Sequence, residues 1–290
     1  MISTCINWQA LLSFVMTVHS RLAFAVVCLV LLVGGSSHAQ FYYPDQKIYS
    51  RPADYGGLRI QELTFPSEDG TKLHGWLIMA KGRRPLGTIV HFHGNAQNLT
   101  SHAMGVSWLA EAGYHVFLFD YRGYGKSEGN PTRVGIQADC RAAFEEVKKR
   151  LPREKRFYLF GQSLGAANVM NLAADINDPR VRAVIAEAGF DSYRRIAGEK
   201  LREAGMSWMP NLISTALNPI DAVKHIRAPL LIIHGTEDRV VPFAHGQRLY
   251  EAATDPKTLW RVERTGHLQT FQHAAYRQRF IQWLGRMGRN

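Results

Sequence analysis

The chain has 290 residues, 46% of them hydrophobic and 20% charged, which is the composition of a globular protein with a full core. Its formal net charge of +11 comes mostly from scattered Lys and Arg, and no zinc finger, RNP-like aromatic motif or basic heptad helix accompanies it, so we expect no nucleic-acid partner. A solvated basic surface is the simpler interpretation, and contact with an anionic membrane is the alternative. Three cysteines, Cys5, Cys28 and Cys140, are too few for a disulfide framework.

The N-terminal segment has the construction of a secretory signal peptide. Arg21 is followed by the apolar run 22–33 and then by small residues that end at Ala39, so we expect cleavage before Gln40. The apolar run is shorter than the roughly 20 residues that span a bilayer. Joined to an earlier apolar stretch it would make an uncleaved membrane anchor, but a His-Ser-Arg tripeptide interrupts the join. Residues 1–39 are therefore predicted to export the protein to the periplasm or the exterior, with membrane anchoring as the alternative.

From residue 58 onward, short β-rich apolar runs alternate with longer segments of helical period. The runs that predict strands are 58–65, 73–79, 88–92, 115–119, 157–160, 181–186, 230–233 and 259–262. The segments that predict helices are 100–112, 132–151, 164–176, 244–253 and 268–287. The first strands have no helix between them and should pair antiparallel, whereas helices separate the later strands, which should pair in parallel. Residues 40–290 are thus predicted to form one α/β domain, a mostly parallel eight-stranded sheet flanked by helices.

One interval departs from this alternation. Between the strands at 181–186 and 230–233 the chain is longer than one crossover helix requires. Its apolar residues would form the underside of a lid, the side that faces the active site: Met206, Trp208, Met209, Leu212 and Ile213. We predict a small helical lid at about 190–220, and an extra packed helix pair is the alternative interpretation.

The pattern Gly-x-Ser-x-Gly occurs twice, as GKSEG at 125–129 and as GQSLG at 161–165. A nucleophile elbow needs a strand leading in, a tight turn and a helix leading out, with glycines that let strand and helix pack closely. GQSLG lies between an apolar run and good helix formers, whereas GKSEG is followed by Asn-Pro, which indicates a loop. GKSEG does not end a phosphate-binding loop either, because Asp120 stands where such a loop needs its first glycine. Ser163 is therefore the candidate nucleophile.

A serine nucleophile needs a base that removes its proton, and the base needs a third group to orient it. After a nucleophile elbow the acid comes next along the chain and the histidine last. His267 follows the last predicted strand with Gly266 before it, so its imidazole should lie over the sheet edge. His273 lies inside the following helix and His234 ends a strand, and we expect both to be structural.

The acid should follow the strand that precedes His267. The segment LLIIHGTEDRVVP offers Glu237 and Asp238 there, and Asp238 is preferred because the residues after it turn into the next helix. Asp191, which follows the strand at 181–186, is the alternative acid.

Attack on a carbonyl creates an oxyanion, which backbone N–H groups must stabilise. One donor should be the N–H of Leu164, at the start of the helix after the elbow, and the other the N–H of Asn95, after the strand 88–92. His91 and His93 have no third ligand at a suitable spacing, so a structural role is expected for them and no metal site is predicted. The Asn-Leu-Thr sequon at Asn98 lies so near this loop that we interpret it as coincidence.

Five motifs, in this order, resemble the α/β-hydrolase superfamily: HGNAQN, DYRGYGKSEG, GQSLG, HGTEDRVVP and Gly266-His267. More narrowly, the chain from residue 58 to its end resembles the branch that contains the ABHD12/13/17-like and Bem46-like serine hydrolases. The resemblance implies hydrolysis of esters, thioesters or, less often, amides, on a small-molecule or lipid-like acyl substrate and without a cofactor. It also explains GKSEG, which in this family belongs to a structural loop after the fourth strand. One departure is Asp191, where many relatives carry an uncharged residue.

These features predict a serine hydrolase of carboxylesterase or thioesterase type, with Ser163, Asp238 and His267 as the triad and with Leu164 and Asn95 as oxyanion donors. A serine aminopeptidase of the same fold is one alternative, although no acidic pair is placed to hold a substrate amine. An enzyme that opens haloalkanes or epoxides would carry Asp at position 163. A catalytically inactive binding protein is the alternative from another class, and it predicts a broken triad. Acyl-chain preference, leaving group and oligomeric state do not follow from the sequence.

Overall fold

The computed structural model describes residues 42–82, 84–203 and 213–289. The predicted leader at 1–39 lies outside the described residues, as do Met206, Trp208, Met209 and Leu212 of the predicted lid underside. Of the helices in the described ranges, none combines the length and the apolar character that crossing a membrane requires.

An eight-stranded sheet in the order β10-β9-β8-β7-β4-β6-β3-β2 forms the centre of the domain. Its strands are β2 (Ile60–Pro66), β3 (Lys72–Ile78), β4 (Thr88–Phe92), β6 (His115–Phe119), β7 (Phe157–Gln162), β8 (Val181–Glu187), β9 (Leu230–Gly235) and β10 (Lys257–Val262). Antiparallel pairing is confined to β2 with β3 and β3 with β6, and the remaining neighbours pair in parallel. The predicted mostly parallel sheet is confirmed.

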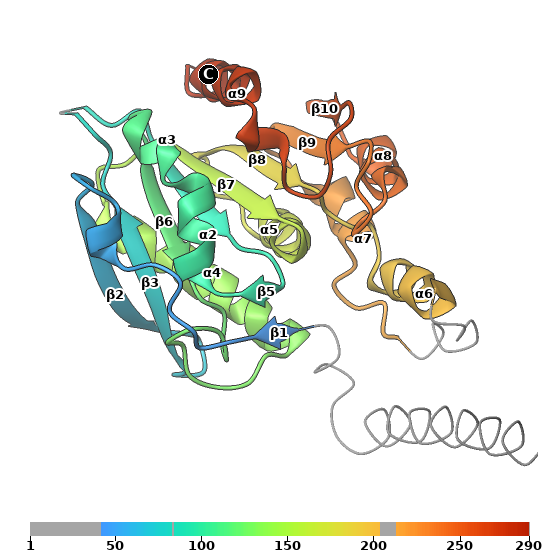
Figure 1. Ribbon diagram of the computed structural model, residues 1–290, viewed down its shortest axis with the longest axis horizontal. Coiled ribbons are helices and arrows are strands. Elements are labelled where there is room, and N and C mark those ends of the chain that lie inside the picture. The colour runs from blue at the N-terminus through green and yellow to red at the C-terminus, as the bar shows by residue number, and fades with distance from the viewer. Residues whose placement is uncertain (1–41, 83, 204–212, 290) are drawn as a thin grey trace, which may run out of the picture. The chain divides into compact units, whose positions relative to one another are not determined.

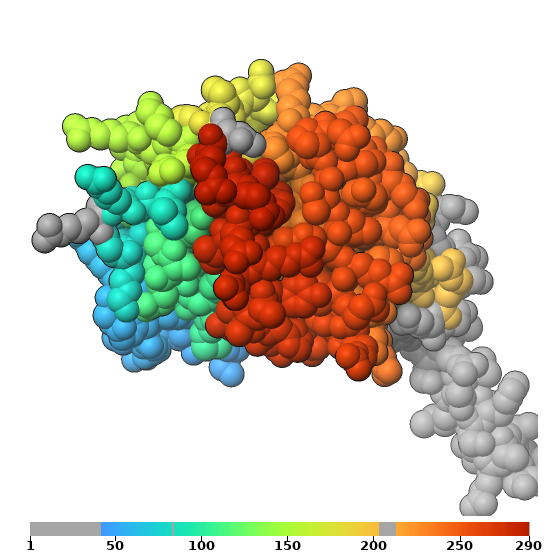
Figure 2. Space-filling view, turned by 90° about the horizontal axis from the view of Figure 1, so that it is seen from above, coloured from blue at the N-terminus to red at the C-terminus, as the bar shows by residue number. Residues whose placement is uncertain are grey.

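Helices cover both faces of this sheet (Figure 1). One face carries α2 (Leu99–Val106), α3 (Trp108–Glu111) and α9 (Ala274–Met287), whose apolar side chains share one core cluster. The other face carries α4 (Arg133–Arg150), α5 (Leu164–Asp175) and α8 (Phe243–Ala252), which contribute to a second cluster. Seen from above, α9 in dark red lies between the cyan and green segments near α2 and α3 and the orange segments near α8 (Figure 2).

Two predicted helices differ from the structure by more than one residue at an end. The helix predicted at 100–112 is divided into α2 and α3 at Ser107. The helix predicted at 268–287 begins only at Ala274: Leu268 has a φ of 55°, in the left-handed region that a right-handed helix excludes, and His273 is extended, with a φ of −89° and a ψ of 118°. Residues 267–273 consequently form a loop and the short 3-10 turn η5 (Thr270–Gln272).

The interval predicted as a lid forms helices α6 (Tyr193–Glu203) and α7 (Pro219–Ala222), followed by the 3-10 turn η4 (Val223–His225). Ile213, the one described residue of the predicted underside, is partly buried against the core cluster of α4, α5 and α8.

Phe280 of α9 should be a principal contributor to stability. Its ring is fully buried and contacts the rings of Trp108, Phe160, Trp260 and Phe271, which join α9 to the sheet and to α3. Phe280→Ala should lower the free energy of unfolding by about 3–5 kcal/mol, since the ring leaves a cavity. Val134→Ala, at an exposed position on α4, should change it by no more than about 0.5 kcal/mol. Urea unfolding curves measure both, and a loss below about 1 kcal/mol for Phe280→Ala would contradict this packing.

Candidate active site

Ser163 occupies a strained turn between β7 and α5. Its backbone has a φ of 55° and a ψ of −114°, a region that non-glycine residues rarely adopt. The Ser163 N–H donates to the Glu187 carbonyl of β8 at 2.9 Å, and its own carbonyl accepts from the N–H of Ala166 at 3.0 Å. Hydrogen bonds to the neighbouring strand and to the next helix turn therefore hold the serine in this conformation.

The two glycines around Ser163 are required by space. A Cβ on Gly161 would lie 2.2 Å from the carbonyl oxygen of Gly165, and one on Gly165 would lie 1.9 Å from the carbonyl oxygen of Phe92. The backbones of β7, α5 and β4 thus approach one another more closely than any side chain permits.

The serine of GKSEG has a different surrounding. Ser127 is buried, and its hydroxyl accepts from the N–H of His74 at 2.9 Å and donates to the carbonyl of Asp120 at 2.8 Å. Gly125 has a φ of 52°, and a Cβ there would lie 2.1 Å from Oδ2 of Asp120. Ser127 bridges two backbone segments, which is a structural use of the hydroxyl.

Asp238 and His267 lie close together after the ends of adjacent strands β9 and β10. Oδ2 of Asp238 is 2.7 Å from Nδ1 of His267, and Oδ1 accepts from the N–H groups of Val240 and Val241, both at 2.9 Å. The two loops are joined through Thr265, whose carbonyl accepts from the N–H of Glu237 at 3.0 Å. The carboxylate is thereby oriented toward one ring nitrogen of the imidazole.

Electrostatics keep Asp238 ionised although its side chain is buried. Burial alone would raise its pKa, but the rings of His234 and His267 and the N–H of Val241 outweigh burial, so the pKa lies below its usual range. His234 is also fully buried, with Nε2 2.8 Å from the carbonyl of Val241, where it supports the turn that carries the acid. A structural position for His234 agrees with the sequence-based expectation.

Ser163 belongs to the same edge of the sheet as this pair. Strands β7, β8, β9 and β10 are neighbours and parallel, so the residues after their carboxyl ends, Ser163, Asp238 and His267, share one edge. Glu187, the last residue of β8, lies next to the serine. Its carbonyl accepts from the N–H of Ser163 at 2.9 Å, and its buried carboxyl accepts from Nε2 of Gln162 at 2.7 Å.

Glu187 was missed by the sequence analysis. It is 1% exposed, and burial raises its pKa above the ordinary value for glutamate. Nε2 of Gln162 donates to its Oε2 at 2.7 Å, and Oε1 of Gln162 lies 2.9 Å from Nε2 of His91. The one sequence signal for this network was a glutamate directly after the apolar run 183–186.

His91 and His93 both make hydrogen bonds inside the protein. Burial lowers the pKa of His91 to about 3, so its ring is neutral, and Nδ1 of His93 lies 2.7 Å from the carbonyl of Gly94. Within the described residues, no group of three His, Cys, Asp or Glu side chains is arranged to hold a metal ion.

The two expected oxyanion donors lie on segments next to Ser163. Leu164 is the first residue of α5, where a helix leaves the N–H without an intrahelical acceptor. A Cβ on Gly94 would lie 3.8 Å from Cβ of Ser163, so the loop that carries Asn95 passes directly beside the serine. Both segments therefore lie beside the serine.

Asp191, the alternative acid, is bonded to other partners. Its fully buried carboxylate lies 2.7 Å from Nδ1 of His245 on α8 and pairs with Arg195 and Arg248. Nε2 of His245 lies 2.9 Å from a carboxylate oxygen of Glu199 on α6. This cluster around the buried Asp191 and His245, which no sequence pattern predicted, joins the segment after β8 to α6 and α8.

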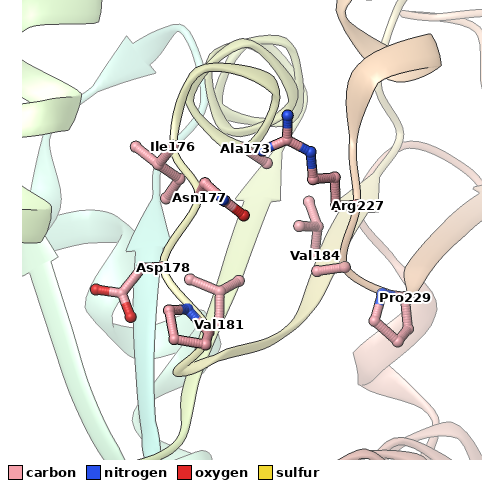
Figure 3. A pocket seen from close by; sticks show the side chains of 10 residues that line it. Ala173, Ile176, Asn177, Asp178, Val181, Val184, Arg227 and Pro229 are labelled. Atoms are coloured by element: carbon pink, nitrogen blue, oxygen red, sulfur yellow. The ribbon is translucent and has the colours of Figure 1, made fainter.

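A cavity of about 230 Å³ lies at the opposite end of the strands. Figure 3 shows its lining: Ala173, Ile176, Asn177, Asp178, Val181, Val184, Arg227 and Pro229 among others. Val181 begins β8 and Pro229 precedes β9, so the cavity is at the amino ends of these strands. Ser163 is at the carboxyl ends, and the cavity is therefore separate from the candidate active site.

Comparisons with known proteins agree with this architecture. A family model described as "Serine aminopeptidase, S33" matches residues 83–218. The chain is 36% identical to the uncharacterized protein YfhR of Escherichia coli, over 90% of this chain and 92% of that protein. It is 33% identical to the lysophosphatidylserine lipase ABHD12 of Danio rerio, over 83% of this chain and 70% of that protein.

Among solved structures, the Pyrococcus furiosus esterase Pf2001 is similar, with a TM-score of 0.70 and 22% identity, over 87% of this chain and 98% of that one. At this identity the likeness demonstrates the fold.

The lowered pKa of Asp238 predicts a pH dependence. A carboxylate whose pKa is depressed by folding stabilises the folded state above its unfolded pKa of about 3.9, and this contribution is lost as the pH falls below that value. Asp238→Asn has no such carboxylate. The difference in unfolding free energy between wild type and Asp238→Asn should therefore be larger at about pH 5 than at about pH 3, as measured by urea unfolding. A difference that grows on acidification would contradict the lowered pKa.

Proposed function

Because this chain belongs to the α/β-hydrolase superfamily, as an ABHD-like member, we propose that it is a serine hydrolase that cleaves carboxylic esters or thioesters through an acyl-enzyme intermediate. One observation carries the proposal. A serine held in a strained elbow shares the sheet edge with a histidine whose Nδ1 is 2.7 Å from a buried, ionised carboxylate. That combination is the arrangement that nucleophilic catalysis by serine requires.

In this mechanism Oγ of Ser163 attacks the acyl carbon while Nε2 of His267 accepts the hydroxyl proton. The N–H groups of Leu164 and Asn95 stabilise the negative charge on the former carbonyl oxygen. The imidazolium then gives its proton to the departing alcohol or thiol, which leaves the acyl group on Ser163. A water molecule, deprotonated by the same imidazole, releases the carboxylic acid and restores the serine.

Asp238 has two tasks in this scheme. By accepting a hydrogen bond from Nδ1–H of His267 it selects the tautomer whose Nε2 lone pair faces the serine. Because it stays ionised, it also stabilises the imidazolium that forms in each half-reaction.

Ester or thioester cleavage is favoured over removal of an N-terminal amino acid. The family model carries an aminopeptidase description, so an amide hydrolase is the second candidate. An aminopeptidase needs a free carboxylate for the substrate amine. Near Ser163, however, Glu187 is buried against Gln162 and Asp191 is buried against His245 and two arginines. The lysophosphatidylserine lipase among the relatives supports a lipid-like acyl substrate.

The identity of the nucleophile can be tested with the two serines of the repeated motif as matched variants. Ser163→Ala should abolish labelling by a fluorophosphonate probe, because the attacking oxygen is removed. Ser127→Ala should keep labelling, although loss of its buried hydrogen bonds should cost about 1–3 kcal/mol of stability. Gel fluorescence after probe treatment measures both. Strong labelling of Ser163→Ala would overturn the assignment.

The substrate class can be tested with a panel of p-nitrophenyl esters of increasing chain length, an acyl thioester and an aminoacyl p-nitroanilide. We expect an acyl-enzyme burst and turnover with the esters and the thioester at a kcat/KM well above that for the anilide. The reverse order would favour the aminopeptidase, and absence of an acyl-enzyme with every compound would favour an inactive binding protein.

A further inference from the structure

Residues 42–50, which precede the central sheet, contact the loop 93–98 that follows β4 and the start of α2; we call them the N-terminal strap. Within the strap, β1 (Tyr43–Pro44) pairs in parallel with β5 (Ala96–Gln97) of the loop. The two short strands lie side by side in Figure 1. The strap is outside the region 83–218 that the family model matches, and no sequence pattern predicted its pairing.

Asn95, the proposed oxyanion donor, is held from two sides. The N–H of Tyr43 in the strap donates to Oδ1 of Asn95 at 3.2 Å. The hydroxyl of Tyr124 donates to the carbonyl oxygen of Asn95 at 2.9 Å and lies 3.1 Å from the same Oδ1. Tyr124 is fully buried, so water does not compete with Asn95 for its hydroxyl.

Asn98 fastens the strap to the same loop. Its side chain is 1% exposed, and Nδ2 donates to Oδ1 of Asp45 and to the carbonyl of Lys47, both at 2.8 Å. Its Oδ1 accepts from the N–H of Thr100 at 3.0 Å and so caps α2. The strap, the loop and the helix start are therefore one bonded unit. Nδ2, the atom that would carry a glycan, is already occupied.

These contacts matter for catalysis because Gly94 precedes Asn95. Glycine leaves the backbone before Asn95 conformationally free, and the direction of the Asn95 N–H depends on the dihedral angles there. The Gly94 carbonyl, which shares a peptide unit with that N–H, lies 2.7 Å from Nδ1 of His93. The bonds to the carbonyl and to the side chain of Asn95 restrict the dihedral angles on the other side of the same N–H. Preorganised donors stabilise the transition state because they need no reorganisation at the moment of reaction.

We propose that the N-terminal strap and Tyr124 are positioning elements of the oxyanion site, which hold Asn95 so that its N–H faces the reacting carbonyl oxygen. The inference rests on the proposed function and assigns a catalytic consequence to a segment outside the matched family region. Tyr124 belongs to the DYRGYGKSEG loop, so that loop supports the donor opposite the nucleophile elbow.

Tyr124→Phe tests the proposal with the least change of shape. We expect kcat for the best p-nitrophenyl ester to fall by about 10- to 100-fold, while KM stays within about threefold. The expected fall is smaller than that for complete removal of an oxyanion donor, because the Asn95 N–H is still present and only its orientation is less restricted. Affinity for a trifluoromethyl ketone, which forms a tetrahedral adduct with the serine, should fall by a similar factor. Tyr158→Phe is the matched control: it also removes a buried hydroxyl bonded to a carbonyl, that of Leu284 at 3.2 Å, and should keep the wild-type kcat.

A second pair of variants tests the strap itself. Tyr43→Pro and Tyr43→Ala both lack the exposed ring, but only Tyr43→Pro lacks the N–H that bonds Asn95. Residue 43 already precedes a proline, so its backbone is confined to the extended region that proline can adopt. We expect the lower kcat in Tyr43→Pro.

The outcomes separate the two proposals. Wild-type kcat in both Tyr124→Phe and Tyr43→Pro would overturn this inference alone. A fall in activity of these variants that matches their loss of titratable active sites would also overturn this inference. A purely structural role lowers the amount of folded enzyme and leaves the turnover of each active site unchanged. Absence of an acyl-enzyme in the wild-type protein would overturn the proposed function together with this inference.

Discussion

The close approach of three backbone segments at Ser163 is the constraint on which the rest of the site depends. Gly161 and Gly165 let β7 and α5 come together, and Gly165 also lies against the carbonyl of Phe92 in β4. Only with this packing can the serine take its positive φ and stand clear of the strand end. The same packing brings the amino end of α5 beside the loop after β4. In the proposed mechanism it therefore determines where the two oxyanion donors lie.

Two buried carboxyl groups, those of Asp238 and Glu187, lie at the same edge of the sheet as Ser163. Asp238 is buried yet ionised, because backbone N–H groups and two imidazole rings surround it. Glu187, one strand away, is buried with Gln162 as the donor to its carboxyl, and burial raises its pKa. Two carboxyl groups at one edge thus have pKa values displaced in opposite directions. In the proposed mechanism the ionised one orients the histidine, and the other accepts a hydrogen bond from the side chain of Gln162, next to the nucleophile.

The two Gly-x-Ser-x-Gly motifs have complementary places in the structure. GQSLG forms the strained elbow, and GKSEG belongs to a loop whose serine and tyrosine bond the backbone of neighbouring segments. Asp191, the alternative acid, pairs with His245 and two arginines and so connects the segment after β8 to α6 and α8. The second motif and Asp191 are each accounted for by bonds within the fold.

The sequence by itself determined the family, the mostly parallel sheet and which Gly-x-Ser-x-Gly motif lies between a strand and a helix, because these depend on periodicity, on glycine spacing and on the order of motifs along one chain. Strand bounds at 88–92 and 115–119 agree with the structure to the residue. Three contacts were decided only by the tertiary structure. The Glu187 carbonyl accepts from the N–H of Ser163, the ring of His245 pairs with Asp191, and residues 42–50 pair with the loop that carries Asn95. The physical reason is that these are single polar contacts between distant segments. Apolar periodicity reports which face of an element is buried, but a polar side chain's partner is defined only when the packed backbone brings the two together.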